Sequence, residues 1–260
     1  MSAPASVGVD AGSTTFKAVA IDGEGRIVAS FLEPADPRIE EQAARALASL
    51  GAEGGVPAVP VGATGYGRRR VAATRALTEI TCHARGAFFR TREPGILVDV
   101  GGQDTKVVRV GPGGTVLDFA MNDKCAAGTG RFLEVVLARL RVPPGEVAQY
   151  VARASRTVPV TSTCTVFAES EVVSLVARGE PVEDIVKGLH AALASRVASL
   201  VGPVPAGARV FMSGGVALNP AMVDALSQAL GAPVAVVPDP QLVGALGAAL
   251  SALEAEAPRT

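Results

Sequence analysis

Two cysteines are the residues of this chain best suited to redox or metal chemistry. Cys125 lies in N-D-K-C-A-A-G-T-G-R-F and Cys164 in T-S-T-C-T-V-F-A-E-S-E, and each is placed where a loop gives way to an expected helix. Neither has a second cysteine nearby. A four-thiolate iron–sulfur cluster on these residues would therefore take its other two ligands from a second copy of the chain. By spacing alone, isolated cysteines are more often packed structural residues than ligands.

A duplicated hairpin pattern supplies groups that suit a nucleotide. V-G-V-D-A-G-S-T-T-F-K-A-V-A-I-D and I-L-V-D-V-G-G-Q-D-T-K-V-V-R-V each predict a strand, a turn of small residues and a second strand. They share D-x-G-x-x-x-x-K at an offset of 89 residues by subtraction, which indicates an internal duplication. Small turns let N–H groups and hydroxyls approach a phosphate. The predicted phosphate-binding residues are Gly12, Ser13, Thr14, Thr15 and Lys17 in the first hairpin and Gly101, Gly102 and Gln103 in the second.

The acidic residues of the hairpins favour hydrolysis assisted by a metal ion. Asp10 and Asp99 are expected to hold Mg²⁺ through water, because that ion keeps several waters and needs few carboxylates. Gln103 or Asp104 would then orient an attacking water. An ordinary hairpin with a tight turn explains either motif alone equally well. The presence of both motifs favours a nucleotide-binding site. The chain has no G-x-x-x-x-G-K-[ST], so it is not a P-loop protein.

Three further segments are predicted to contact the nucleotide. Gly214 and Gly215 follow a short apolar strand, where missing side chains make room for a base and ribose and where Asn219 would hydrogen-bond. A plain strand-to-helix turn is the common alternative. A second segment precedes an expected helix and would present N–H groups to a phosphate. The residues of this second segment are Gly128, Thr129 and Gly130, and Gln241 completes the predicted set.

Composition limits the possible classes of protein. Because 48% of the 260 residues are hydrophobic and 19% are charged, we expect a globular chain with one substantial core or two small domains. A net charge of -1 without a long Lys/Arg run argues against a nucleic-acid partner. The N-terminus lacks a basic stretch followed by an apolar run, so we expect a cytoplasmic protein with no membrane partner. Three cysteines disfavour a disulfide scaffold.

Helical spacing of apolar residues alternates with the expected strands. It predicts helices over residues 40–50, 131–140, 169–178, 182–200 and 221–230. The order of strands and helices predicts an α/β fold with two lobes around a nucleotide cleft. The expected first lobe spans residues 1–93, the second spans 94–240 and carries both cysteines, and a C-terminal helix over 241–260 packs back on the first lobe.

The motifs resemble those of known ATPases. D-A-G-S-T-T-F-K, D-V-G-G-Q-D-T-K and M-S-G-G-V-A-L-N are similar to the two phosphate motifs and the adenosine motif of the actin, heat-shock 70 and sugar-kinase type ATPase fold. The resemblance implies duplicated mixed sheets flanked by helices. More narrowly, N-D-K-C-A-A-G-T-G-R-F, T-C-T-V-F-A-E-S-E-V and I-T-C-H-A-R-G-A resemble the activator component of 2-hydroxyacyl-CoA dehydratases. That family is shared with the ATP-binding subunits of benzoyl-CoA reductase, and the resemblance covers nearly the whole chain.

The resemblance implies an ATP-hydrolysing electron donor. It implies a homodimer that holds one [4Fe-4S] cluster on Cys125 and Cys164 of both chains. This dimer would hydrolyse Mg-ATP to ADP while passing a low-potential electron, received from a ferredoxin or flavodoxin, to a dehydratase. Cys82 is expected to be a packed thiol, because two cysteine pairs already supply four ligands, and His83 is expected to be structural.

Other functions stay open. An ATP-dependent reductase component for a benzoyl-CoA-type or double-cubane-cluster reductase is the nearest alternative. A small-molecule kinase of the same fold, or a nucleotide-dependent structural or sensor protein, is more distant. The two cysteines favour the electron donor, because neither kinase chemistry nor filament formation needs thiolates at a dimer axis.

Overall fold

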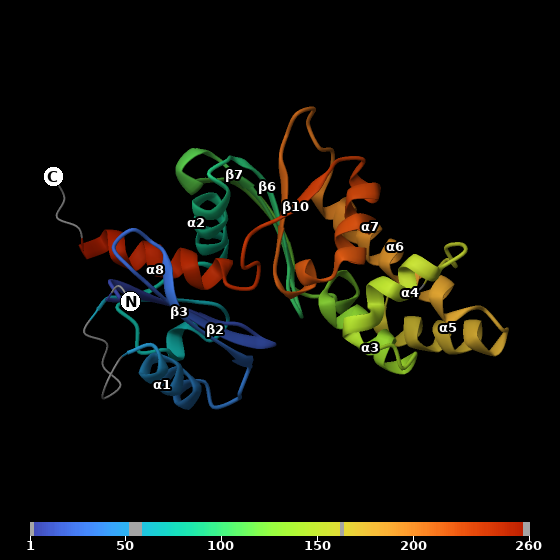
Figure 1. Cartoon of the computed structure of the whole chain (residues 1–260), viewed down its shortest axis with the longest axis horizontal. Helices are drawn as coiled ribbons and strands as arrows, with labels where there is room; N and C mark the ends of the chain where they lie inside the picture. The colour runs from blue at the N-terminus through green and yellow to red at the C-terminus, as the bar shows by residue number, and fades with distance from the viewer. Residues whose placement is uncertain (1–2, 52–58, 162–163, 257–260) are drawn as a thin grey trace. The chain divides into compact units, whose positions relative to one another are not determined.

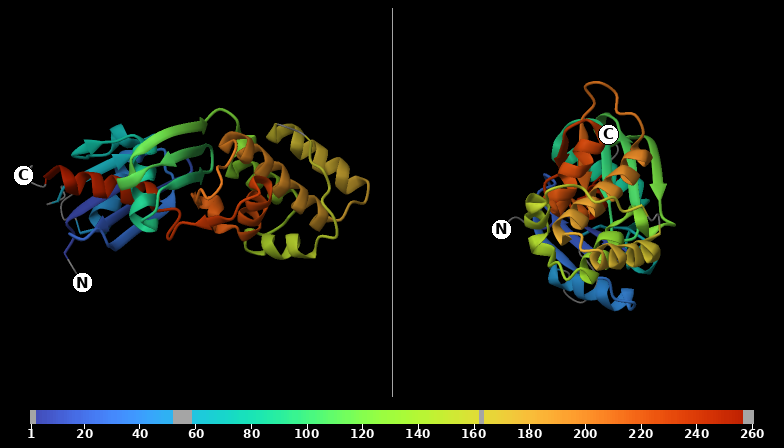
Figure 2. Two further views of the ribbon diagram at one scale, coloured as in Figure 1. Left: turned by 90° about the horizontal axis from the view of Figure 1, so that it is seen from above. Right: turned by 90° about the vertical axis from the view of Figure 1, so that its right-hand side faces the viewer.

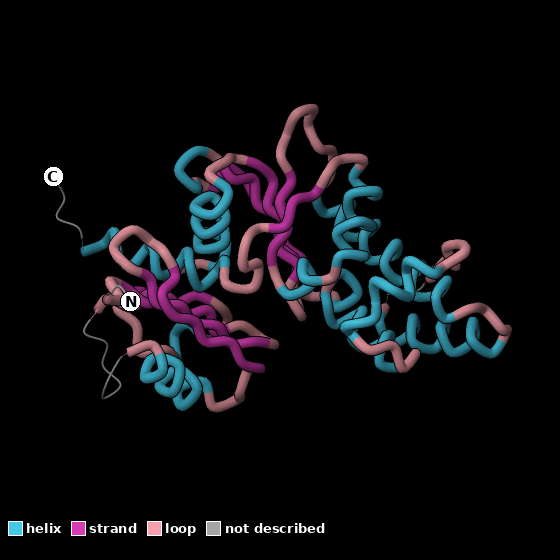
Figure 3. Tube along the Cα trace, viewed as in Figure 1, coloured by secondary structure: helices cyan, strands magenta, loops and turns pink. Residues whose placement is uncertain are grey.

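The computed structural model describes residues 3–51, 59–161 and 164–256. The chain forms two compact units, each built around a five-stranded sheet with helices (Figures 1 and 3). The first unit comprises Met1–Pro94, Val108–Asp118 and Val237–Thr260, and the second comprises Gly95–Val107 and Phe119–Val236. Duplicated sheets flanked by helices confirm the predicted α/β class. The predicted lobe boundary at residues 93 and 94 stays a prediction.

The first sheet has the strand order β3-β2-β1-β4-β5. Strands β1, β2 and β3 are antiparallel neighbours, whereas β1 with β4 and β4 with β5 are parallel pairs. The register of the first hairpin sets Asp10 opposite Lys17. The strands are β1 (Ser6–Ala11), β2 (Thr15–Ile21), β3 (Ile27–Pro34), β4 (Val61–Thr64) and β5 (Arg75–Ala76).

Successive side chains of β2 point to opposite faces of the sheet, and each face packs against a different helix. Phe16, Ala18 and Ala20 belong to the hydrophobic cluster that includes α1 (Ile39–Ser49). Val19 and Ile21, which point the other way, belong to the cluster that includes α8 (Val243–Glu256). Helix α8 also packs along β1, β4 and α2 (Glu79–Thr91), and Figure 2 shows it in red beside the blue strands. A short 3₁₀ helix, η2 (Arg68–Arg70), follows β4.

The second sheet has the order β10-β9-β6-β7-β8, with β6 and β9 parallel and β9 and β10 parallel. Apolar residues of β6, β9 and the helices of this unit form one hydrophobic core. The strands are β6 (Gly95–Val100), β7 (Thr105–Val110), β8 (Val116–Asn122), β9 (Val210–Ser213) and β10 (Val234–Val236). The helices are α3 (Gly130–Arg139), α4 (Val147–Arg153), α5 (Thr165–Ala177), α6 (Val182–Val201) and α7 (Pro220–Leu230), with 3₁₀ turns η3 (Pro112–Gly114), η4 (Ala126–Gly128), η5 (Pro144–Glu146) and η6 (Gly215–Leu218).

Most predicted helices are present within two residues of their expected ends. Helix α5 differs, because it begins at Thr165, four residues before the predicted start at Glu169. Its first turn carries Val166 and Phe167 on the exposed side, which hides the amphipathic pattern. The predicted C-terminal helix over 241–260 corresponds to α8 (Val243–Glu256), and residues 257–260 of that prediction lie outside the described residues. Helices α2 and α4 were not predicted. The buried side of α2 is made of small or polar residues, including Cys82, Gly86 and Ala87, and these give a weak periodic signal.

Within the described part of the chain, none of the helices is long and apolar enough to cross a membrane.

Candidate functional site

The first hairpin holds its acidic and basic residues together. Lys17 Nζ donates to Asp10 Oδ2 at 3.1 Å, and the Asp10 side chain is almost fully buried. The turn requires glycine at position 12, because a Cβ there would lie 2.8 Å from the Thr15 carbonyl oxygen and 3.1 Å from Lys17 Nζ. Ser13 is exposed, and with Gly12 it lines a cavity of about 310 Å³. The first predicted phosphate turn is therefore open to a ligand.

Residues distant in sequence surround the Asp10 carboxylate. A Cβ at Gly65 would lie 2.7 Å from Asp10 Oδ1, and one at Gly244 would lie 3.1 Å from Asp10 Oδ2. The same Gly244 position is 2.8 Å from Nε2 of the buried His83. These two glycines and His83 form the surroundings of Asp10, which the sequence pattern did not reveal. Gln241 lies three residues before Gly244, at the start of the segment that leads into α8.

The second hairpin repeats the arrangement of the first with an additional acidic residue. Lys106 Nζ lies 2.7 Å from Asp104 Oδ2 and 3.6 Å from Asp99 Oδ2, and all three side chains are buried. Ser213 Oγ donates to Asp99 Oδ1 at 2.7 Å, which connects this hairpin to the end of β9. Gln103, by contrast, is exposed at the turn. Of the two residues predicted to orient water, only Gln103 presents its side chain to solvent.

The segment from Gly128 to Gly130 supports the second turn. The N–H groups of Gly130 and Arg131 donate to the carbonyl oxygens of Gly101 and Gly102 at 2.8 and 2.9 Å. Thr129 Oγ1 donates to the Gly102 carbonyl at 2.9 Å. Of the three amides predicted to face a phosphate, that of Gly130 contacts the turn, whereas those of Gly128 and Thr129 donate to the carbonyl oxygens of Cys125 and Ala126. The start of α3 therefore fixes the conformation of the turn that Gly101 and Gly102 form.

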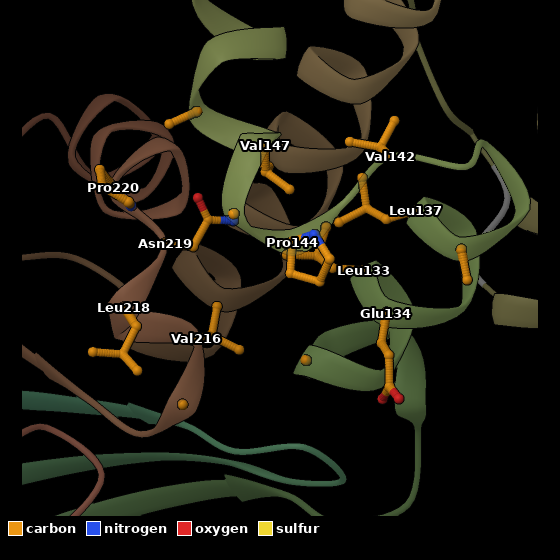
Figure 4. A pocket seen from close by; sticks show the side chains of 15 residues that line it. Leu133, Glu134, Leu137, Val142, Pro144, Val147, Val216, Leu218, Asn219 and Pro220 are labelled. Carbon is orange, nitrogen blue, oxygen red and sulfur yellow. The ribbon is translucent and has the colours of Figure 1, made fainter.

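The segment after β9 borders an apolar cavity of about 550 Å³, a volume typical of small-molecule sites. Gly214 has φ of 88°, and a Cβ there would overlap the Val100 carbonyl oxygen, so no other residue fits without strain. Figure 4 shows the lining side chains, which come from α3 and the start of α4 and from the segment that follows Gly214. The labelled ones are Leu133, Glu134, Leu137, Val142, Pro144, Val147, Val216, Leu218, Asn219 and Pro220.

The predicted ligand cysteines both precede helices and reach solvent. Cys125 is exposed and is the N-cap of η4, and Cys164 is half-buried and is the N-cap of α5. Asn122 fixes the Cys125 loop, because its Oδ1 accepts the Cys125 N–H at 3.2 Å and its Nδ2 donates to the Cys125 carbonyl at 2.9 Å. Helices α3 and α5 are in contact. Thus the two cysteines belong to neighbouring helical segments of the same unit.

Arg196 is a neighbour of Cys125 that the sequence did not indicate. It lines a cavity of about 470 Å³ together with Cys125 and Asn122. Its guanidinium stacks on the Phe132 ring at 4.9 Å and contacts the Ala127 carbonyl oxygen at 3.4 Å. Burial lowers the pKa of Arg196, while negative charge on Cys125 acts to raise it. A fixed cation therefore lies near the Cys125 thiol.

Cys82, unlike the other two cysteines, is shielded from solvent. It is fully buried in α2, and burial raises the pKa of its thiol to about 12. Such a thiol is inert toward metals and oxidants at neutral pH. Over residues 3–51, 59–161 and 164–256, no three side chains of His, Cys, Asp or Glu gather closely enough to form a metal site by themselves.

Known proteins are similar to this chain in sequence and in architecture. The chain is 41% identical over 254 residues to the activator of lactoyl-CoA dehydratase from Anaerotignum propionicum, covering 96% of this chain and 97% of the relative. It is 32% identical to one of the subunits of benzoyl-CoA reductase from Thauera aromatica, covering 94% and 91% of the two chains. The structure of the activator of 2-hydroxyisocaproyl-CoA dehydratase from Clostridium difficile, with bound ADPNP, superposes with a TM-score of 0.85 at 40% identity, covering 96% and 94%.

A more distant structure shows the fold alone. A glucokinase of the ROK family from Streptomyces griseus superposes with a TM-score of 0.61 at 17% identity, covering 96% of this chain and 99% of that chain. The predicted relation to sugar-kinase type ATPases is confirmed at the level of the fold. A sequence model of one ATPase family matches residues 7–252, nearly the whole chain. This protein therefore belongs to the BadF/BadG/BcrA/BcrD ATPase family.

Proposed function

We propose that this chain is an ATP-hydrolysing activator that passes a low-potential electron to an iron–sulfur dehydratase of 2-hydroxyacyl-CoA. The observation that carries the proposal is the pair of solvent-accessible cysteines, Cys125 and Cys164, at helix starts in a member of an ATPase family. A dehydratase activator is 41% identical to this chain, whereas the benzoyl-CoA reductase relative is 32% identical, so a dehydratase is the favoured partner.

The nucleotide part of the proposal assigns roles to both hairpins. The turns of Gly12–Thr15 and Gly101–Gln103, with Lys17, contact phosphates, and Asp10 and Asp99 are candidates to hold Mg²⁺ through water. Gln103 orients the attacking water, because Asp104 is buried against Lys106. The base and ribose occupy the cavity lined by Gly130 and by Gly215, which is next to Gly214 in the sequence. The physiological reductant would be a ferredoxin or flavodoxin.

The cysteines fit a shared [4Fe-4S] cluster by their chemistry and exposure. Both thiols are free and reach the surface, so both can bind a group that a second chain completes. Cys164 precedes the 13-residue helix α5, whose N-terminus stabilises negative charge on a thiolate. The positive charge of Arg196 would likewise stabilise a thiolate at Cys125, because both residues line the same cavity. When bound, the cluster would supply a one-electron redox centre.

The exposed face of α5 supports a homodimer. Val166 and Phe167, two and three residues after Cys164, are each 69% exposed, and Val173 and Val176 continue the apolar surface along the helix. Residues 166, 173 and 176 are separated by seven and three positions, so they lie on one side of the helix. We assign this face to a second copy of the chain, because the same copy would bring the two missing thiolates.

Anaerobic purification with iron analysis and sedimentation tests the proposal. We expect about four irons per dimer. Cys125→Ser and Cys164→Ser should each abolish the cluster while ATP binding persists. Cys82→Ser is the matched control and should retain the cluster, because that thiol is buried in α2.

Three results would contradict the proposal. One is about four irons per monomer, which would exclude a shared cluster. Another is a cluster that survives Cys125→Ser. The third is stoichiometric phosphorylation of a sugar or carboxylic acid by ATP, which would make the protein a kinase.

A further inference from the structure

We infer that Asn219, oriented by His190, is the residue through which the apolar cavity selects its base, favouring adenine over 6-oxopurines. The inference rests on the proposed nucleotide function and extends it to base selection. It follows from a continuous series of hydrogen bonds that links α6, the cavity and the start of α7.

The series begins at a histidine that is 1% exposed. His190 Nδ1 lies 2.7 Å from the Val186 carbonyl oxygen, one helical turn earlier in α6. A carbonyl oxygen only accepts, so Nδ1 carries the proton and Nε2 of the neutral ring is an acceptor. Asn219 Nδ2 donates to this Nε2 at 2.9 Å. Because His190 Nε2 accepts, the NH₂ group of the Asn219 amide, and not its oxygen, faces the histidine.

The other end of the amide is fixed independently. Asn219 is the N-cap of α7, and its Oδ1 accepts the Ala221 N–H at 3.1 Å. Turning the amide over would set Nδ2 against the Ala221 N–H and Oδ1 against the lone pair of His190 Nε2. Both contacts would become repulsive, so the side chain has one favourable orientation.

The fixed amide keeps capacity for a ligand. A carboxamide offers two N–H donors and two acceptor positions, and His190 and Ala221 use one of each. Among the described residues that line the cavity, only Asn219 and Glu134 have polar side chains. The Glu134 carboxylate is paired with Arg131 at 3.0 Å. Asn219, labelled in Figure 4, is therefore the amide available to a base.

A fixed amide distinguishes purines by the group at position 6. Adenine carries an amino donor there, whereas guanine and hypoxanthine carry a carbonyl acceptor. The inference assigns Asn219 Oδ1 to the adenine amino group and the remaining Nδ2 N–H to the adjacent ring acceptor N1. A 6-oxopurine in the same position would set its carbonyl oxygen against Oδ1 and its N1–H against Nδ2, so both contacts would be mismatched. An amide free to turn over would accept either class, so His190 is a positioning residue for base selection.

Calorimetric titration of the purified protein with ADP and IDP tests the inference. Wild-type protein should bind ADP at least about tenfold more tightly than IDP. Asn219→Ser keeps a capping hydroxyl but removes the amide, so the ratio should fall below about threefold. His190→Ala should lower it similarly, and His190→Gln should restore it, because the glutamine carbonyl accepts from Asn219 Nδ2. Leu117→Ala on β8, which lies outside the cavity lining, is the control and should leave the ratio unchanged.

The outcomes separate this inference from the proposed function. Equal affinity of the wild type for ADP and IDP, or a wild-type ratio in Asn219→Ser or His190→Ala, would overturn the base-selection role while leaving the ATPase intact. Failure of the wild type to bind either nucleotide would overturn both. If His190→Ala does not fold, as checked by thermal unfolding, Asn219→Ser and His190→Gln still decide the question.

Discussion

At the residue scale, both hairpins place a lysine close to the aspartate near the end of the preceding strand. Lys17 lies 3.1 Å from Asp10, and Lys106 lies 3.6 Å from Asp99. A buried carboxylate needs such a partner, since removing the countercharge leaves an uncompensated charge in a low dielectric. The same lysines place a positive charge within 4 Å of each carboxylate.

Neutralising Asp10 should impair hydrolysis without unfolding the protein. Asp10→Asn keeps the size of the side chain and an acceptor for Lys17, but it loses the charge that a hydrated cation requires. We expect at least a tenfold fall in the rate of ATP hydrolysis, or about 1.4 kcal/mol in barrier, and a similar fall for Gln103→Ala. The control is Asp36→Asn, which lines the cavity beside Gly12 and Ser13 but pairs with Arg38. Equal rates for Asp10→Asn and the control would exclude the assigned role.

His190 should make stability depend on pH. Burial lowers the pKa of this histidine, whereas in the unfolded chain it titrates near 6.5. Below that pH the unfolded state binds more protons than the folded state, so the free energy of unfolding should fall as pH drops from 6.5 toward the folded pKa. His190→Gln should remove this part of the dependence. Urea unfolding at pH 8, 6.5 and 5.5 measures it, and parallel curves for the two proteins would contradict it.

At the scale of elements, the close packing of α8 depends on glycine. A Cβ at Gly8 of β1 or at Gly62 of β4 would overlap a carbonyl oxygen of α8, that of Ala245 or Ala248. A Cβ at Gly247 of α8 would overlap the Cys82 carbonyl of α2. Ser6 Oγ adds a hydrogen bond to the Ala249 carbonyl at 2.9 Å. Helix α8 therefore packs directly against the backbone of β1, β4 and α2, and Gly244 in α8 lies next to Asp10.

Gly247→Ala should destabilise the protein, although alanine favours a helix by about 1 kcal/mol over glycine. The added methyl group has no room at Cys82, and overpacking of this kind typically costs about 1–3 kcal/mol. Guanidinium unfolding provides the measurement. Gly145→Ala is the control, because a Cβ there meets no atom within 4 Å. A stabilised Gly247→Ala protein would show that α8 and α2 do not pack this closely.

At the scale of the whole molecule, the apolar face of α5 should control assembly. Val173→Glu introduces a charge on the proposed interface without touching Cys164, so we expect monomers in sedimentation velocity at concentrations where the wild type is dimeric. Leu117→Glu on β8 is the matched control, because Leu117 is also an exposed apolar residue. A dimer that withstands Val173→Glu would place the second copy elsewhere.

The sequence by itself determined the features that depend only on residues close to one another along the chain. The two D-x-G-x-x-x-x-K hairpins were predictable, because a period of two and a glycine at the turn are local properties. The helices α1, α3, α6 and α7 were predictable from apolar spacing, whereas the start of α5 directly after Cys164 came four residues earlier than the spacing predicted. The roles assigned to the site residues remain predictions.

Only the tertiary structure decided which distant residues meet. Ser213 bonds to Asp99 from 114 positions away, and Asn219 bonds to His190 from 29 positions away. Strand order and helix packing set these contacts, and no local pattern encodes them. Helix α2 was also not predictable from the sequence. Its buried residues are small, which lets α8 approach closely, but small residues give no apolar periodicity. The burial of Asp104 against Lys106 likewise follows from the folded hairpin, where desolvation forces the carboxylate to keep its countercharge.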